Sequence, residues 1–146
     1  MPRVKLNELK KYRFRYKRRF GPRDITCAGH MNNDALVSLL GLARAEMFRT
    51  LDLNELDLGD GQTGIIVTDL VINYRAEAFV HDDLLVETDI GDISEKNFRM
   101  FQRATRGRTL VALAEQGISA YSYGAREVTR IPESFLKALE TNRAQH

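Results

Sequence analysis

The feature that most constrains this sequence is a proline-free stretch from Asn33 to Leu51 that is apolar on nearly every side of a helix. Its apolar residues at helical spacing are Leu36, Val37, Leu39, Leu40, Leu42, Ala43, Met47, Phe48 and Leu51. A helix that is apolar all round is a buried one, and this one would be roughly 30 Å long. We therefore expect this helix to be the structural axis of the fold. Asn32, Asn33 and Asp34 all suit an N-cap, so the helix begins within a residue or two of them.

Strand patterns lie on both sides of this helix in the sequence. Before it, aromatic and cationic side chains alternate from Tyr12 to Lys17, which predicts a half-buried strand. After a connection at residues 53–63, segments rich in β-branched residues predict four more strands, at residues 64–75, 84–90, 98–105 and 110–123.

Turns and ends complete the expected order of elements. A turn is expected at residues 81–83 and a tight hairpin at Arg106-Gly107-Arg108. Pro132 suits the first position of a short closing helix over residues 132–142, and residues 1–10 suit a partly frayed lead-in. The strands after the helix leave no room for crossover helices. The sequence therefore predicts an α+β fold with one curved, antiparallel, five-stranded sheet wrapped around the helix.

Length and composition favour one domain over residues 1–146. The chain has 146 residues and is 43% apolar, enough to cover a sheet face and bury a helix. It has no apolar run of about 18 residues, and its N-terminus is basic and polar, so we expect an untargeted cytoplasmic protein without a membrane span. The single cysteine, Cys27, excludes an internal disulfide, and no zinc or nucleotide-loop pattern is present, so we expect no metal.

Positive charge is concentrated at the front of the chain. Residues 1–23 hold ten of the 22 Lys and Arg residues but only one of the 20 acidic residues. Such an arm could contact nucleic acid, an anionic membrane surface or a phosphate-bearing ligand, or it could be a solvated strand face. Nucleic acid is the less favoured partner because the aromatic and cationic side chains of the first strand point to opposite faces.

Three segments resemble one known family. Residues 20–33, Phe-Gly-Pro-Arg-Asp-Ile-Thr-Cys-Ala-Gly-His-Met-Asn-Asn, are similar to the Asp-x-Asp-x-x-Gly-His-Val-Asn-Asn signature of the 4-hydroxybenzoyl-CoA thioesterase-like hotdog family. Ala43 to Met47 resembles the Ala-Arg-x-Glu stretch of that family's central helix, and Val71 to Asp83 resembles its strand, turn and Asp-Asp segment. The similarity as a whole covers roughly residues 12–125, with compatible spacing throughout.

The resemblance implies a hotdog fold and hydrolysis of acyl-CoA thioesters. It also implies a homodimer or homotetramer whose sheets join edge to edge, with each site between two subunits. No cofactor is implied, because coenzyme A is part of the substrate. Exposed strand edges in a small antiparallel sheet independently favour pairing with another copy.

Backbone N–H groups at the start of the central helix are the candidate oxyanion donors. Those of Gly29, Met31 and Asn32 lie at the positive end of the helix dipole and would bind substrate there. The alternative is that this segment only caps the helix. Gly29 either permits close backbone approach or is a turn glycine.

The catalytic group is where this sequence departs from the family. Thr26 occupies the position of the usual catalytic Asp; a hydroxyl can orient water or attack if a neighbour takes its proton, but it is no base at neutral pH. Asp24 and His30 are each a candidate base or a brace for the loop. Asn33 could hold the water or the thioester carbonyl, or it could only cap the helix. Asp34 could assist catalysis, or it could only complement the helix dipole. The other hypothesis is a catalytically impaired protein that binds acyl thioesters.

Glu46 and one set of cations are the remaining charged candidates. Glu46 lies 13 residues beyond Asn33, about 20 Å along the helix, and is interpreted as structural. Cations on or near one predicted hairpin could contact the phosphates of coenzyme A or could form a solvated strand face. They are Lys96, Arg99, Arg103 and Arg106.

Overall fold

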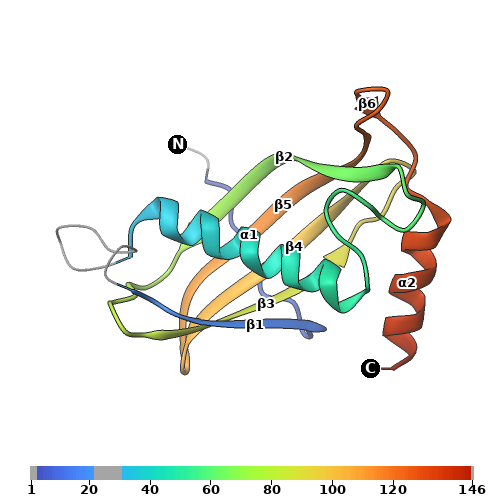
Figure 1. Ribbon diagram of the computed structural model, residues 1–146. Helices are drawn as coiled ribbons and strands as arrows, with labels where there is room; N and C mark the ends of the chain where they lie inside the picture. The colour runs from blue at the N-terminus through green and yellow to red at the C-terminus, as the bar shows by residue number, and fades with distance from the viewer. Residues whose placement is uncertain (1–2, 22–30, 146) are drawn as a thin grey trace.

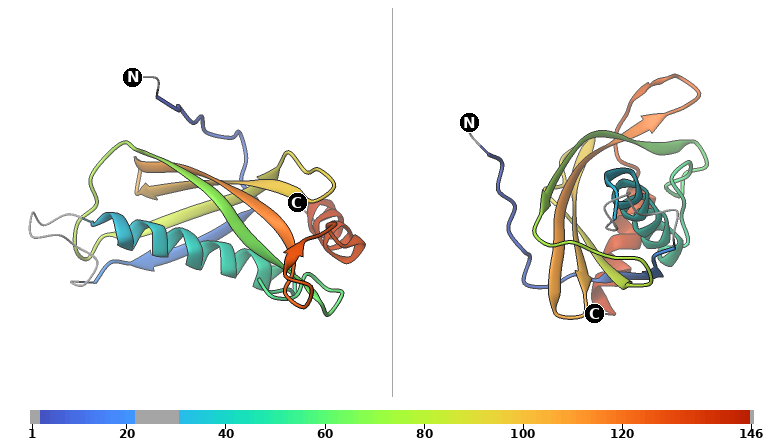
Figure 2. Two further views of the ribbon diagram at one scale, coloured as in Figure 1. Left: turned by 90° about the horizontal axis from the view of Figure 1, so that it is seen from above. Right: turned by 90° about the vertical axis from the view of Figure 1, so that its left-hand side faces the viewer.

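The computed structural model describes residues 3–21 and 31–145, which form one antiparallel sheet and two helices (Figure 1). The sheet has the strand order β1-β3-β4-β5-β2, and a short strand, β6, pairs with β5. The strands are β1 (Phe14–Arg19), β2 (Thr63–Tyr74), β3 (Asp83–Gly91), β4 (Asn97–Arg106), β5 (Thr109–Ser122) and β6 (Glu127–Val128). The sheet curves around the long helix α1 (Asn33–Thr50), and helix α2 (Glu133–Ala144) lies near the C-terminal end of α1 (Figure 2).

The sequence predicted this architecture closely. The curved antiparallel sheet around one long helix is confirmed, and the predicted helix start agrees with α1, whose N-cap is Asn32. Two details differ. The two-residue strand β6 was not predicted, because it is too short to show a period of two. Pro132 is the N-cap of α2 and not its first helical residue, and α2 continues to Ala144.

One expectation about α1 is wrong for the described residues. Val37 and Leu42 are 41% and 38% exposed, so the helix is not covered on every side. The physical reason is visible along the helix in the right-hand view of Figure 2, where the sheet curves around only part of the circumference of α1. Two apolar side chains on different sides of the exposed face of α1 are therefore left open in the single chain.

Two apolar clusters hold α1 against the sheet. The C-terminal half packs through Phe48 against α2 and β4, where the ring of Phe135 lies 6.0 Å from that of Phe48 and 5.3 Å from that of Phe98. The N-terminal half packs through Leu36 and neighbouring residues onto β3 and β5. Because both halves are anchored, the start of α1 has a fixed position relative to the sheet.

A chain of buried polar side chains also joins α1 to the sheet. Gln102 Nε2 donates to the Leu40 carbonyl at 2.9 Å, and Gln116 Nε2 donates to Gln102 Oε1 at 2.5 Å. Arg44 donates to Gln116 Oε1 at 2.7 Å and also to Glu55. Burying a polar group without a hydrogen bond lowers the stability of the fold. These hydrogen bonds therefore favour one rotation of α1 about its axis.

A β-bulge divides strand β2. Its pairing with β5 runs from Val67 opposite Ile118 to Asp69 opposite Gly117, so Thr68 is an additional residue on β2. Ile65 packs in one apolar cluster and Ile72 against the other, although seven residues separate them and side chains alternate along a strand. The additional residue restores Ile72 to the helix-facing side.

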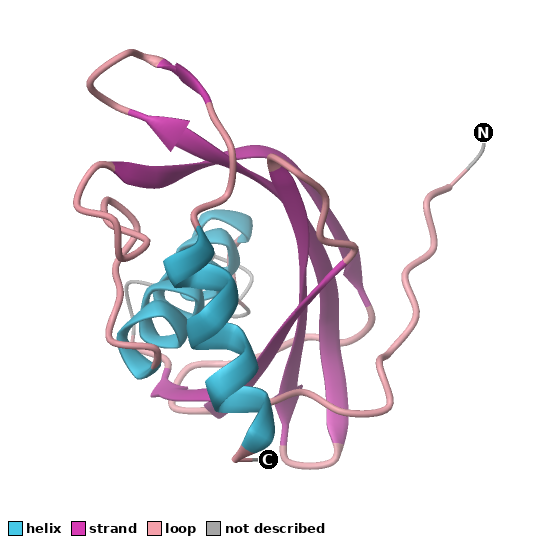
Figure 3. Ribbon diagram, turned by 90° about the vertical axis from the view of Figure 1, so that its right-hand side faces the viewer, coloured by secondary structure: helices cyan, strands magenta, loops and turns pink. Residues whose placement is uncertain are grey.

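The N-terminal segment does not lie with the helices. Residues 3–13 run along the opposite, outer side of the sheet (Figure 3). Contacts separated by many residues hold this segment in place, including an ion pair between Glu8 and Arg103 at 3.1 Å, where a frayed lead-in was expected. Among the described residues, no helix has the length and apolarity needed to cross a membrane.

Candidate active site at the start of the central helix

The start of α1 is held against the connection between β2 and β3. Met31 donates its backbone N–H to the Ala78 carbonyl at 2.8 Å, and Phe20 donates to the Asp82 carbonyl at 3.0 Å. Phe20, before segment 22–30, and Met31, directly after it, therefore both contact residues 78–82. Four predicted site residues lie outside the described residues, namely Asp24, Thr26, Gly29 and His30.

Three of the predicted site residues that the structure describes line a pocket of about 500 Å³. This size falls within the range of small-molecule sites. Met31, Asn32 and Asn33 line one side, and the end of β2 with the following connection lines the other. The residues from that second side are Tyr74, Arg75, Ala76, Glu77 and Ala78. The structure thus brings the helix start together with a strand end about 40 residues later in the sequence.

Tyr74 is the main pocket residue that sequence reasoning missed. Its hydroxyl donates to Asn33 Oδ1. Burial, and then the nearby Asp34 carboxylate, raises the pKa of the Tyr74 phenol above its usual value of 10.0, so the phenol stays protonated. The available signal was its position as the last strand residue before the connection that contacts the helix start.

The helix start leaves two hydrogen-bond donors for a ligand. The Asn32 side chain caps α1 by accepting from the Ala35 N–H at 2.7 Å, and the Leu36 N–H donates to the Asn32 carbonyl. Among the described residues, the N–H groups of Asn33 and Asp34 have no acceptor. Free N–H groups at the positive end of a helix dipole can bind an anion or an oxyanion.

Asn33 adds a side-chain donor to this arrangement. Because the Tyr74 hydroxyl occupies Asn33 Oδ1, the Asn33 amide NH2 is the group left to face a ligand. Asp34 is exposed and stands in the first turn of α1, close enough to Tyr74 to affect its pKa. The pocket therefore combines backbone and side-chain donors with two carboxylates, that of Glu77 in its lining and that of Asp34 beside Tyr74.

The four cations predicted to contact phosphates do not line this pocket. Arg99 and Arg103 alternate with buried residues of β4 and so lie on the outer face. Arg99 is paired with Asp69 at 2.7 Å and with Glu115 at 2.6 Å. These hydrogen-bonded carboxylates, with that of Asp69 first, raise the pKa of the Arg99 guanidinium.

The other members of that set differ from one another. Arg103 pairs with Glu87 at 2.7 Å, and Arg106 pairs with Asp82 at 3.4 Å and donates to the Glu77 carbonyl at 3.1 Å. Lys96 has no ion pair within the described residues. A role for these four in binding coenzyme A stays a prediction.

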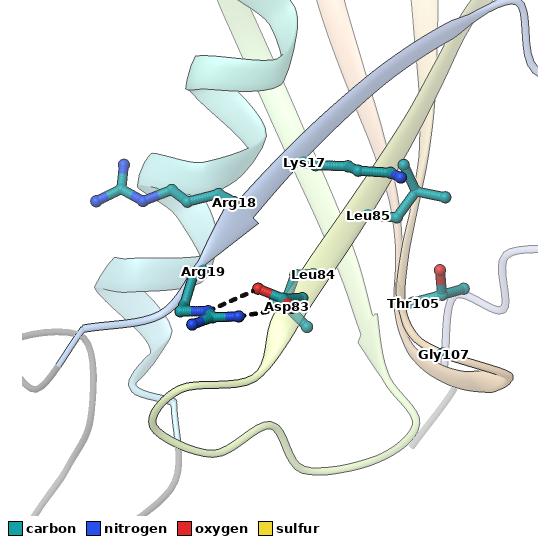
Figure 4. Close-up of a pocket in the computed structure, with 8 residues that line it drawn as sticks. All are labelled: Lys17, Arg18, Arg19, Asp83, Leu84, Leu85, Thr105 and Gly107. Carbon is teal, nitrogen blue, oxygen red and sulfur yellow. Dashed lines mark hydrogen bonds and ion pairs between the residues drawn. The ribbon is translucent and has the colours of Figure 1, made fainter.

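A second cavity, of about 510 Å³, lies beside the C-terminal end of β1 and the start of β3 (Figure 4). Arg19 is paired there with Asp83 at 2.9 Å, while Lys17 and Arg18 point in opposite directions. The cavity takes no residue from α1. It lacks the helix-start donors that an acyl-transfer site requires, so it is not the candidate active site.

Two further expectations concern groups away from the pocket. Glu46 is paired with Arg49 at 2.5 Å on the surface of α1, in agreement with a structural role. Within residues 3–21 and 31–145, no group of three His, Cys, Asp or Glu side chains is arranged to hold a metal ion.

The curved antiparallel sheet around one long helix is the hotdog fold, and solved structures share it. The 1,4-dihydroxy-2-naphthoyl-CoA thioesterase from Synechocystis superposes with a TM-score of 0.77 at 19% identity, covering 86% of this chain and 94% of that chain. A Thermus thermophilus thioesterase solved with coenzyme A and Zn has a TM-score of 0.77 at 18% identity, covering 93% and 98%. A hypothetical Staphylococcus aureus protein solved with CoA has a TM-score of 0.81 at 16% identity, covering 96% and 89%.

The chain belongs to the thioesterase-like superfamily, whose sequence model matches residues 20–139. A search of curated protein sequences found no match. The superfamily match begins at the predicted signature segment and includes the whole pocket described above.

Proposed function

We propose that this protein hydrolyses acyl-CoA thioesters in the pocket at the start of α1. The observation that carries the proposal is the set of unoccupied donors there, the Asn33 amide and the N–H groups of Asn33 and Asp34. Membership of the thioesterase-like superfamily supports the reaction, and structural relatives solved with coenzyme A support the substrate class.

Thioester hydrolysis places negative charge on the carbonyl oxygen when water adds. In this proposal the carbonyl oxygen accepts from the Asn33 amide and from the free N–H groups at the helix start, which stabilises the developing oxyanion. Tyr74 holds Asn33 in the orientation that presents its NH2 group. The sulfur then leaves as the thiol of coenzyme A, and the acyl group leaves as the free acid.

Water must also lose a proton. Asp34 is a described carboxylate suited to this role because it lies beside Tyr74 and next to Asn33. Asp24 and His30 remain proposed bases, with Thr26 orienting the water. Thr26, at the position of the family's usual Asp, is the observation that favours the second candidate function, an acyl-thioester binding protein without hydrolysis.

We also propose that the site is completed by a second copy of the chain. Strand β2 is at the end of the sheet order and pairs with β5 along one edge only. Val67, Leu70 and Tyr74 on β2 and Val37 on α1 are exposed in the single chain. Pairing of two β2 edges would cover these side chains and place the partner subunit beside each pocket.

The test is thiol release from a panel of short, long and aromatic acyl-CoAs. Wild type, Asn33→Ala, Thr26→Ala and Thr26→Asp are compared with Asn7→Ala, which removes an exposed amide on the N-terminal segment. Turnover that is lost in Asn33→Ala and kept in Asn7→Ala supports the hydrolase. Binding of acyl-CoA without turnover, together with hydrolysis gained by Thr26→Asp, would establish the binding protein instead.

A further inference from the structure

The N-terminal segment is fastened to the end of β2. The Leu6 N–H donates to Asn73 Oδ1 at 2.7 Å, and Asn73 Nδ2 donates to the Val4 carbonyl at 2.9 Å. Arg75 donates to the Leu6 carbonyl at 3.3 Å. The Asn73 amide thus binds the segment through both its donor and its acceptor. This attachment fixes residues 4–6 beside the strand end that also forms the active-site pocket.

This attachment creates a cationic cleft of about 210 Å³. Its lining residues are Arg3, Lys5, Asn73, Tyr74 and Arg75. None of them is acidic. Within the described residues, the three cations form no ion pair with a carboxylate, whereas Arg13, Arg99 and Arg103 on the same outer face are all paired. The charge of the cleft is therefore available to an anion.

The cleft is adjacent to the pocket at the start of α1. Tyr74 and Arg75 line both, and they stand at the edge of the sheet where its two faces meet. Tyr74 contacts Asn33 on the helix side, while Arg75 contacts Leu6 on the outer side. A ligand that occupies the pocket and continues around this edge would reach the three cations.

We propose that the cleft formed by Arg3, Lys5 and Arg75 binds a phosphate group of coenzyme A while the thioester lies in the adjacent pocket. This inference rests on the proposed substrate class. Guanidinium and ammonium groups form charge-assisted hydrogen bonds with phosphate oxygens, and guanidinium can bind two oxygens at once. The volume is about seven times the ~30 Å³ share of one water molecule, which suits a phosphate group and some hydration. The N-terminal segment, more basic than the rest of the chain, thereby becomes part of the substrate site.

The test is calorimetric titration with coenzyme A, dephospho-coenzyme A and pantetheine. The variant Arg3→Ala/Lys5→Ala removes two cations from the cleft. The control Lys10→Ala/Lys137→Ala removes the same charge from exposed positions that do not line it. We expect the first variant to weaken coenzyme A binding about tenfold, and the control to change it less than about twofold. Pantetheine, which carries no phosphate, should bind the first variant and wild type alike.

The same titrations identify the phosphate. If only coenzyme A is weakened, the cleft binds the 3′-phosphate; if dephospho-coenzyme A is weakened equally, it binds the diphosphate. Wild-type affinity of Arg3→Ala/Lys5→Ala for coenzyme A would overturn the proposal, as would absence of coenzyme A binding by wild type. Binding is measured without turnover, so a protein that binds through the cleft but hydrolyses nothing refutes the hydrolase alone.

Discussion

Substitution Tyr74→Phe tests how the pocket orients its donors. The change removes one hydroxyl and leaves the ring, so the hydrogen bond to Asn33 Oδ1 is lost with little change in shape. A hydrogen bond of this kind contributes about 1 kcal/mol. If that energy holds the Asn33 amide in its productive orientation, its loss corresponds to a roughly five- to tenfold fall in kcat.

The assay is thiol release from the best acyl-CoA of the panel, at saturating and limiting concentrations. Removing the donor itself with Asn33→Ala should lower kcat about 10²–10³-fold, as expected for an oxyanion donor. Tyr123→Phe is the matched control, because the Tyr123 hydroxyl donates to the Ile65 carbonyl at 2.7 Å, away from the pocket. Tyr123→Phe should lower the free energy of unfolding by about as much as Tyr74→Phe does, and it should leave kcat at its wild-type value.

The double variant Asn33→Ala/Tyr74→Phe decides whether Tyr74 acts through Asn33. If it does, the double variant has the kcat of Asn33→Ala alone, because the hydroxyl has no amide left to orient. A double variant whose loss equals the product of the two single losses would refute this reasoning. Full wild-type activity in Tyr74→Phe would do the same.

Three further predictions concern stability. Asn32→Ala should lower the free energy of unfolding by about 1 kcal/mol in urea titration while Asn32→Ser retains most of it, since both Asn and Ser cap helices. Phe135→Ala should cost about 3–5 kcal/mol by the same assay, because the ring is fully buried against α1 and β4. The hydrogen bond from Arg99 lowers the pKa of Asp69 below its usual 3.8, so this pair stabilises the fold above that pH and loses its effect as pH falls through the lowered value. Asp69→Asn should therefore be less stable than wild type at pH 7, and thermal melts should show the difference closing below about pH 4. A difference that stays constant down to pH 2 would contradict that assignment.

Local signals explain the part of the fold that could be predicted. The run Asn32-Asn33-Asp34 before an apolar stretch identified the start of α1, and Gly107, with a φ of 59°, identified the turn between β4 and β5. These features depend on neighbouring residues alone. The antiparallel arrangement followed from the lack of room for crossover helices between the later strands, whereas the strand order was not predicted.

Contacts between distant residues explain what was missed. Tyr74 and Asn33 are 41 residues apart, and a tyrosine in a strand is typical of any half-buried sheet face. The carboxylate partners of Arg99 likewise come from two other strands, 16 and 30 residues away. Strand register decides both contacts, and the sequence did not specify it residue by residue.

The bulge at Thr68 decides which face the end of β2 presents to each side of the sheet. If the bulge were lost with every residue kept, and regular pairing continued from the Ile65 end, Thr68 would lie opposite Gly117 and each later residue would move by one position. Asn73 would then point toward α1 and Tyr74 toward the N-terminal segment, exchanging the partners that each now holds. Deleting Thr68 would instead remove only the additional residue and leave Asp69 opposite Gly117, so both partners would be kept. In aligning distant relatives, a gap of one residue at Thr68 is thus compatible with the same pocket and the same cationic cleft.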